Sequence, residues 1–427
     1  MISKKNLLYI FIFSFCLRLF FIIFLYQHPE KAFEPDSSGY VELAENLIDQ
    51  HTFPSILRTP VYPFFIAVVY SLFGKFPQAV LIVQYFLDSV TAIFVALLFY
   101  RIFGNIKYSY ISGFFYAINP FAVFYSNMIL TETLFTFILT LSVYFLIFFL
   151  RNQQMRYLIL SSFLLGIGTL CRPISLYLPL LLVAFVLTIG NRIKDKIINC
   201  LIFLMIFYIT LLPWYVRNYQ KYDYCTLSAI SDKNIFYYEA PAILMYKSNP
   251  FFKIQFGMDK ILEEYQKNMW AKIRAKYGWD NKSPFEIGNE PKKLIILREE
   301  GLKVIQENPL SFLVIHLNGI GRTLFPFYPY FNKLIGHESK TIKLLSFFID
   351  LIIMGLFLLG LIVYLKDCTR IGFTTIAGIA MIILVFYFSF FPGLAGYSRF
   401  RIPVVPYISI FAALGLWRLP RSLKLRK

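Results

Sequence analysis

The stretch FEPDSSGYVELAEN, residues Phe33–Asn46, determines how the rest of this chain is interpreted. It follows the first apolar run and is acidic, whereas the chain around it is apolar and basic. Its first part is typical of a turn, because proline fixes φ, aspartate and serine bond nearby backbone, and glycine permits positive φ. From Tyr40 the apolar residues recur at helical spacing, which predicts a short amphipathic helix on a membrane surface. We therefore expect Asp36 on a turn at that surface; the alternative is a solvated acid or a helix cap.

The composition indicates an all-α polytopic membrane protein. The 427 residues are 58% hydrophobic and 19% aromatic, which is more apolar surface than a soluble core requires. The net charge of +18 is attributed to basic cytoplasmic loops that contact membrane lipid, and not to nucleic-acid binding. The five cysteines and four histidines are scattered without metal-ligand spacing, which argues against a disulfide framework or a zinc site.

Apolar runs of about twenty residues predict ten membrane spans. They are 7–26, 78–100, 108–125, 131–150, 157–171, 174–189, 197–215, 344–365, 371–391 and 402–417. The first is interpreted as an uncleaved signal anchor with its N-terminus in the cytoplasm. Residues 62–73 are too short to cross and are expected to be re-entrant or interfacial.

Residues 310–330 decide the topology. If they crossed, the basic C-terminal tail would lie outside, so the positive-inside rule favours a non-crossing segment and cytoplasmic termini in a plasma membrane. The predicted organisation is a transmembrane module 1–215, with a first outer loop 27–77 that carries the catalytic Asp36, an extracytoplasmic helical domain 216–343, and a transmembrane module 344–427. Within the middle domain, apolar spacing predicts helices over 258–277 and 291–307, the second capped by Asn289.

With this topology, charged residues from several separate loops fall at the outer surface. They are Asp36, Arg58, Glu132, Arg172, Arg217 beside Asn218, Arg399 and Arg401. Arginines are suited to phosphate binding, because one guanidinium can form two hydrogen bonds to two phosphate oxygens. A carboxylate beside them could serve as a general base or as a metal ligand. Any one of these residues alone is better explained as an interface charge whose side chain extends to water. Together they favour a site that binds a lipid-linked phosphate beside a base.

These residues belong to sequence blocks that resemble a known family. The blocks, in order, are 35–38 with Tyr40 and 44–46, 58–63, 119–120, 125–126 with 131–132, 172–173, 213–214 with 217–219, and 399–403. They resemble the polytopic glycosyltransferases of the GT-C fold, specifically bacterial relatives of the protein mannosyltransferases and lipid A aminoarabinose transferases of glycosyltransferase family 39. The ordered set extends over nearly the whole chain.

The resemblance implies transfer of a sugar from a polyprenyl-phosphate donor to an unknown extracytoplasmic acceptor, which is a lipid, a glycan or a protein. It makes Asp36 the base and uses arginines to bind the leaving phosphate. The predicted site therefore contains catalytic Asp36 and Glu132 and the substrate-binding set Arg58, Tyr62, Arg172, Arg217, Asn218, Arg399 and Arg401. No metal ligand or definite cofactor is predicted, although a divalent cation is left open. Ser37 and Ser398 stand where many relatives have an acid or histidine, which weakens a metal assignment.

Two other functions share most of these features. A ligase or polymerase of lipid-linked oligosaccharides would need the same outer site. A transporter or flippase of lipid-linked sugars would also be polytopic, but we would expect inverted repeats and charges along a path through the bilayer. Here the charges lie at one face, which favours an enzyme.

Two charges inside the predicted spans indicate how the first two spans pack. Arg18 and Asp88 lie at comparable depth, about 12 Å below the outer boundary at 1.5 Å per residue. Because spans joined by one loop often pack together, the two are predicted to pair. In the alternative, Arg18 extends to the interface while Asp88 faces a polar cavity or is protonated.

Overall fold

The structure is a computed structural model that describes residues 2–190, 192–248, 259–281, 283–325, 331–336, 339–368, 372–393 and 398–424. In these ranges the chain forms helices and no strand. Seven helices are long and apolar enough to cross a membrane, which makes this an integral multi-pass membrane protein. The seven are 4–27, 77–103, 132–152, 193–222, 340–367, 373–390 and 398–419.

The N-terminal half contains most of the helical bundle. Its helices are α1 (Lys4–Leu19), α2 (Ile22–Gln27), α3 (Ser37–Asp49), α4 (Val61–Phe73), α5 (Pro77–Phe103), α6 (Ile106–Ala117), α7 (Pro120–Ser126), α8 (Glu132–Asn152), α9 (Met155–Cys171), α10 (Leu178–Val186) and α11 (Ile193–Tyr222). Apolar residues of the bundle form one continuous core.

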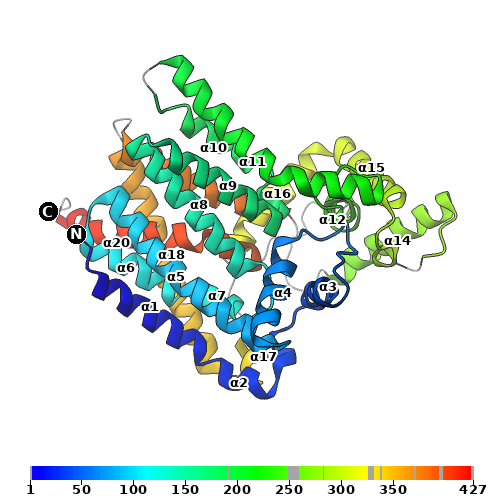
Figure 1. Cartoon of the computed structure of the whole chain (residues 1–427), viewed down its shortest axis with the longest axis horizontal. Helices are drawn as coiled ribbons and strands as arrows, with labels where there is room; N and C mark the ends of the chain where they lie inside the picture. Colours follow the sequence, from blue (N-terminus) through cyan, green and yellow to red (C-terminus); the bar gives the residue numbers. More distant parts are fainter. Residues whose placement is uncertain are drawn as a thin grey trace.

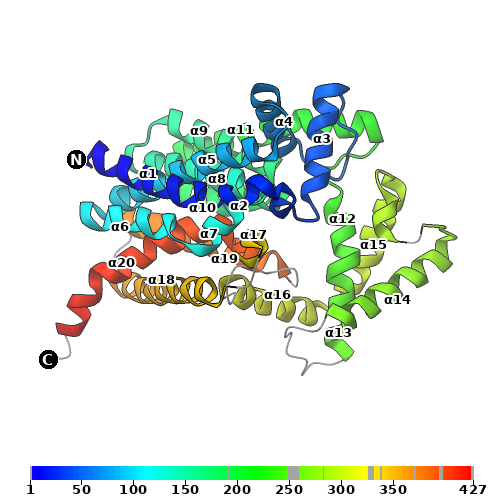
Figure 2. The same cartoon turned by 90° about the horizontal axis from the view of Figure 1, so that it is seen from below.

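The rest of the chain adds a group of mostly polar helices and then returns to the bundle. The elements are α12 (Ile230–Asn234), the π-helical turn η3 (Ile235–Glu239), α13 (Ala240–Ser248), α14 (Asp259–Tyr277), α15 (Pro291–Glu307), α16 (Pro309–Leu324), α17 (Phe331–Ile335), α18 (Lys340–Asp367), α19 (Phe373–Phe390), η6 (Ser398–Val404) and α20 (Val405–Lys424). Helices α12, α14 and α15 lie at one end of the bundle, and both chain ends lie at the other (Figures 1 and 2).

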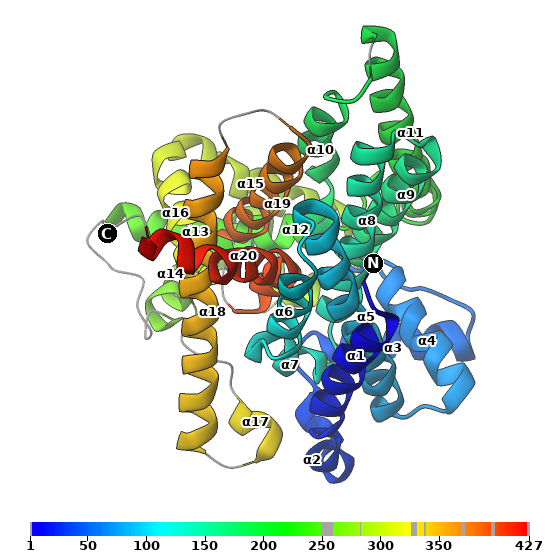
Figure 3. The ribbon, with the colours of Figure 1, turned by 90° about the vertical axis from the view of Figure 1, so that its left-hand side faces the viewer.

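Helices α18 and α20 cross (Figure 3), and two glycines lie where their backbones approach. A Cβ atom on Gly360 would lie 1.9 Å from the Phe411 carbonyl oxygen, and one on Gly415 would lie 2.2 Å from the Leu356 carbonyl oxygen. Only glycine therefore permits this backbone approach, as is common where membrane helices pack closely. The crossing fixes the helix that follows Arg399 and Arg401.

Two predicted spans differ from the observed helices. Residues 108–125 are divided between α6 and α7, because the Asn119 side chain accepts bonds from the backbone N–H groups of Phe121 and Ala122 and Pro120 starts a new helix. Of residues 174–189, only the nine residues of α10 form an α-helix. The number of ten spans is therefore not confirmed.

The other helix predictions are confirmed in most details. Residues 291–307 form α15, and 259–277 of the segment predicted to start at residue 258 form α14; residue 258 lies outside the described residues. Asn289 does not cap α15. Its side chain instead bonds the backbone N–H of Ile56 and the carbonyl of Pro54, so it holds the first outer loop. Helix α16 is not among the candidate spans, and residues 326–330 lie outside the described residues.

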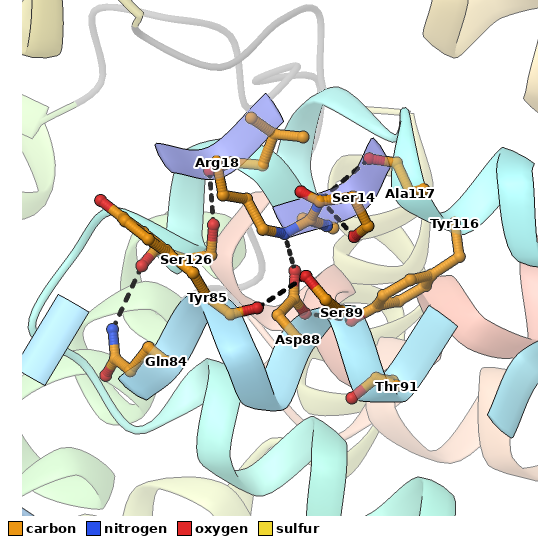
Figure 4. A network of polar contacts seen from close by, with 12 residues as sticks. Ser14, Arg18, Gln84, Tyr85, Asp88, Ser89, Thr91, Tyr116, Ala117 and Ser126 are labelled. Atoms are coloured by element: carbon orange, nitrogen blue, oxygen red, sulfur yellow. Dashed lines mark hydrogen bonds and ion pairs between the residues drawn. The ribbon is translucent and has the colours of Figure 1, made fainter. Parts of the chain in front are cut away.

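The predicted pair between the first two spans is confirmed (Figure 4). The Arg18 guanidinium donates from Nε to the carboxylate of Asp88, and both side chains are buried. Arg18 also donates to the Ser14 hydroxyl and to the carbonyl of Ala117, while the Tyr116 hydroxyl donates to the other oxygen of Asp88. This network joins α1, α5 and α6 beneath the loop that carries Asp36.

Candidate active site

Asp36 lies directly before α3, at the end of the turn that the sequence predicts. Its carboxylate does not cap the helix. One oxygen accepts a hydrogen bond from Arg58 Nη2 at 2.7 Å, and the other accepts from Arg399 Nη1 at 2.6 Å. Arg58 also stacks on the ring of Tyr40, 4.8 Å from its centroid, which orients the guanidinium. Asp36 is therefore held between arginines separated by most of the chain.

A second carboxylate continues this arrangement. Arg399, in η6, donates from Nε to Glu132 at the start of α8. The same Glu132 oxygen lies 2.8 Å from Nη1 of Arg172, the residue that follows α9. Glu132 is completely buried, and Arg172 packs against the rings of Phe135 and Phe400. Five charged side chains therefore alternate in sign, in the order Arg58, Asp36, Arg399, Glu132 and Arg172, and we call them the charged cluster.

The charged cluster has one net positive charge, from three guanidiniums and two carboxylates. Burial alone would raise the pKa of Asp36, but the charges of Arg58 and Arg399 outweigh burial and hold that pKa well below its ordinary value. Asp36 remains about one-third exposed, whereas Glu132 is inaccessible. Of the two acids, only Asp36 can be reached by an incoming molecule.

The other predicted site residues lie outside this cluster. Tyr62 is buried behind it, where its hydroxyl bonds Gln84 and its ring packs edge-on to Tyr40. Arg401 is buried and forms a two-bond ion pair with Asp350 of α18, with both distances 2.8 Å. In this arrangement Arg401 fastens η6 to the bundle, and both of its terminal nitrogens bond Asp350.

Arg217 and Asn218 organise the first outer loop from α11. Arg217 donates to the carbonyls of Ser55 and Phe53 and lies over the ring of Trp214. Asn218 accepts from Arg217 and donates to the carbonyl of Thr226. These contacts position the loop that ends at Arg58, and neither side chain contacts the charged cluster in the described structure.

The sequence pattern does not indicate two partners of the site residues. The spacing around Tyr40 predicts a helix face, yet its hydroxyl accepts a hydrogen bond from Arg58 and its ring packs against the Arg58 guanidinium. Asp350 was not considered, although an acid within an apolar span requires a cation and Arg401 supplies it. Within the described ranges, no group of three His, Cys, Asp or Glu side chains is placed to bind a metal ion.

Comparison with known proteins identifies the fold. Over less than half of the chain, residues 57–215 match the sequence model of the dolichyl-phosphate-mannose-protein mannosyltransferase family, which confirms the predicted resemblance there. No curated protein matches. The apo oligosaccharyltransferase of Archaeoglobus fulgidus is similar in structure, with a TM-score of 0.54 and 15% identity over 99% of this chain and 52% of that chain. The chain has the GT-C fold.

A second solved structure is similar more distantly. ArnT from Cupriavidus metallidurans, bound to undecaprenyl phosphate, is similar with a TM-score of 0.46 and 13% identity over 94% of this chain and 61% of that chain. This GT-C chain spans about half the length of the oligosaccharyltransferase structures that it matches. The predicted fold class, an all-α polytopic GT-C bundle, is confirmed.

Proposed function

We propose that this chain transfers a sugar from a polyprenyl-phosphate donor to an acceptor outside the cytoplasm. This proposal rests on the charged cluster. Its arginines come from three separated segments: two of them hold the partly exposed carboxylate of Asp36, and Arg172 is joined to them through Glu132. This arrangement suits a phosphate beside a general base. The matching family is named for dolichyl-phosphate-mannose, a lipid-linked donor of this class.

In the proposed reaction the bond between the sugar C1 and the phosphate oxygen breaks, and its electron pair leaves with the polyprenyl phosphate. The acceptor hydroxyl oxygen forms the new bond to C1, and its proton passes to Asp36. Arg58, Arg172 and Arg399 bind the phosphate and stabilise the charge that develops on the leaving oxygen. No oxidant, reductant or further reactant is required.

Donor binding would also activate the base. In the resting arrangement both carboxylate oxygens of Asp36 are bound by arginines, so Asp36 holds a proton weakly. A phosphate that draws Arg58 and Arg399 toward itself removes those bonds and raises the pKa of Asp36. The base would therefore become effective when the donor is in place, which limits unproductive proton uptake.

The sequence assigned Glu132 a catalytic role, and its burial supports a different one. A side chain with no exposed surface cannot meet an acceptor, but it contacts both Arg172 and Arg399. We propose that Glu132 positions these two arginines for the phosphate. Arg217 and Asn218 would act indirectly, by holding the loop that presents Arg58.

The test is transfer from radiolabelled polyprenyl-phosphate sugars in membranes that contain the native chain or a variant. Asp36→Asn is expected to abolish transfer, because the amide keeps the shape but cannot accept the proton, while donor binding is retained. The matched control is Asp49→Asn, at an exposed acid at the end of α3 that pairs with Lys75.

Each other outcome has a defined meaning. Near-normal turnover by the Asp36→Asn variant would refute Asp36 as the base. Label that appears in lengthened lipid-linked glycans would indicate a ligase or polymerase. Label that crosses the membrane while it remains on its carrier would indicate a flippase.

A further inference from the structure

Lys233 lies beside the charged cluster but is not part of it. It belongs to α12, in the segment that packs on the first outer loop. Ala229 N–H donates to the carbonyl of Ile56 at 3.0 Å, and the Ser228 hydroxyl donates to the carbonyl of Leu57, the residue before Arg58. These bonds place the start of α12 against the backbone that carries Arg58.

The Lys233 side chain is buried without a counter-ion. It is 4% exposed, and within the described part of the chain its ammonium group has no hydrogen-bond or ion-pair partner; the charge that acts on it is that of Arg58. The neighbouring acid, Asp232, accepts from the Tyr224 hydroxyl instead. A buried lysine usually requires a partner, because removing an ammonium group from water is costly. An unpaired one next to an arginine therefore points to an anion that is not part of the chain.

The electrostatic effects on Lys233 agree with this position. Burial and then the charge of Arg58 lower the pKa of Lys233 to about 8. The lysine is thus still protonated at neutral pH. Directly after α12, η3 forms a π-helical turn, a feature that often occurs at functional sites.

We infer that Lys233 binds the phosphate of the leaving polyprenyl phosphate and neutralises the second negative charge that this group acquires. The inference rests on the proposed function. A sugar phosphodiester carries one negative charge, which balances the single net positive charge of the charged cluster. The phosphate monoester that leaves carries nearly two at neutral pH. Lys233 supplies the additional positive charge beside Arg58.

This arrangement makes Lys233 selective for the product side of the reaction. An interaction that strengthens as the C1–oxygen bond breaks lowers the barrier, whereas one equally strong with the donor does not. Lys233 would therefore contribute little to donor binding and much to turnover. The distinction gives the inference a measurable signature that a structural lysine would lack.

The experiment measures equilibrium binding of two probes to the purified full chain in detergent. One is a C15 isoprenyl phosphate, a monoester with nearly two charges, and the other is its methyl ester, a diester with one. Lys233→Met keeps the length of the side chain and removes the charge. We expect it to weaken monoester binding about tenfold or more and to change diester binding less than about twofold. Lys267→Met, at an exposed lysine of α14, is the matched control and should change neither.

Two further measurements separate this role from a structural one. Because methionine is not penalised by burial, Lys233→Met should unfold at a higher temperature than the native chain even though it binds the monoester less well. Monoester binding by the native chain should also decline above about pH 8, where Lys233 loses its proton, and the variant should lack this decline.

The outcomes distinguish the inference from the function on which it rests. Suppose that Arg172→Ala and Arg399→Ala weaken the binding of both probes, while Lys233→Met weakens the binding of neither probe or of both equally. The role of Lys233 is then refuted and the proposed function stands. If the arginine variants bind both probes as the native chain does, the proposed phosphate site itself is wrong.

Discussion

Replacing Arg18 by methionine would leave Asp88 as an unpaired charge inside the bundle. The two side chains are 0% and 2% exposed, so neither has access to water. Removing one partner of such a pair typically destabilises a protein by about 3–5 kcal/mol. We expect that cost for Arg18→Met and again for Asp88→Leu, because each change leaves a buried charge without its partner.

The double variant should be far more stable than the two single effects suggest. It retains no charge at the site, and Ser14 can bond its own helix. The main remaining loss is the acceptor of the Tyr116 hydroxyl, worth about 1–3 kcal/mol. The singles sum to roughly 6–10 kcal/mol, so the expected coupling energy is at least about 3 kcal/mol in favour of the double variant.

The assay is a denaturant titration of the purified chain in mixed micelles, applied to the native protein, both single variants and the double variant. The exposed pair Lys75–Asp49 provides a control cycle, with an expected coupling below about 1 kcal/mol. A double variant at Arg18 and Asp88 that loses as much stability as the two singles together would refute the reasoning, because it would mean that the pair contributes nothing as a unit.

Three further predictions address the site, the topology and the pH dependence of stability. Arg172→Ala and Arg399→Ala should each reduce donor use by the equivalent of about 1.5–3 kcal/mol. Arg151→Ala, outside the charged cluster, should have little effect in the same transfer assay. Equal effects of all three substitutions would contradict phosphate binding by Arg172 and Arg399. A reporter that works only outside the cytoplasm should be active after Asp280 and silent after Lys366, and activity at Lys366 would show that residues 310–330 cross. Burial raises the pKa of Glu239, which lies near Arg322 and His316, from 4.5 to about 7. The stability that Glu239 contributes should therefore be complete below about pH 4.5 and should be lost as the pH rises through 7, a decline of roughly 3 kcal/mol in the free energy of unfolding. If a Glu239→Gln variant shows the same decline, the decline belongs to other groups.

Regular helices and charge pairs within spans could be predicted from the sequence. In residues 291–307 the apolar residues recur at helical spacing, and a proline follows at residue 309. These residues form α15 with the same limits. Arg18 and Asp88 are similarly constrained, since a charge in an apolar span has few available partners. The break at Asn119 was harder to predict, because the apolar run continues through it.

The sequence predicts which residues belong to the candidate site better than it predicts which residues they contact. Asp36, Arg58 and Arg399 fall on one face by topology, and the structure brings them together. Topology could not show that Arg217 binds backbone carbonyls or that Arg401 binds Asp350, because those partners depend on loop and helix packing. Lys233 gave no signal, since a lysine in a polar helix is ordinarily solvated.

The position of Arg399 has a consequence for how the protein is made. Asp36 and Glu132 are synthesised well before Arg399, the arginine that joins them. Until then Glu132 has Arg172 as its cation, and Asp36 has Arg58. Without Arg399 these contacts divide into two separate ion pairs, and the charged cluster is incomplete. The five side chains can therefore come together only after the segment that carries Arg399 has been made, long after Asp36 and Glu132.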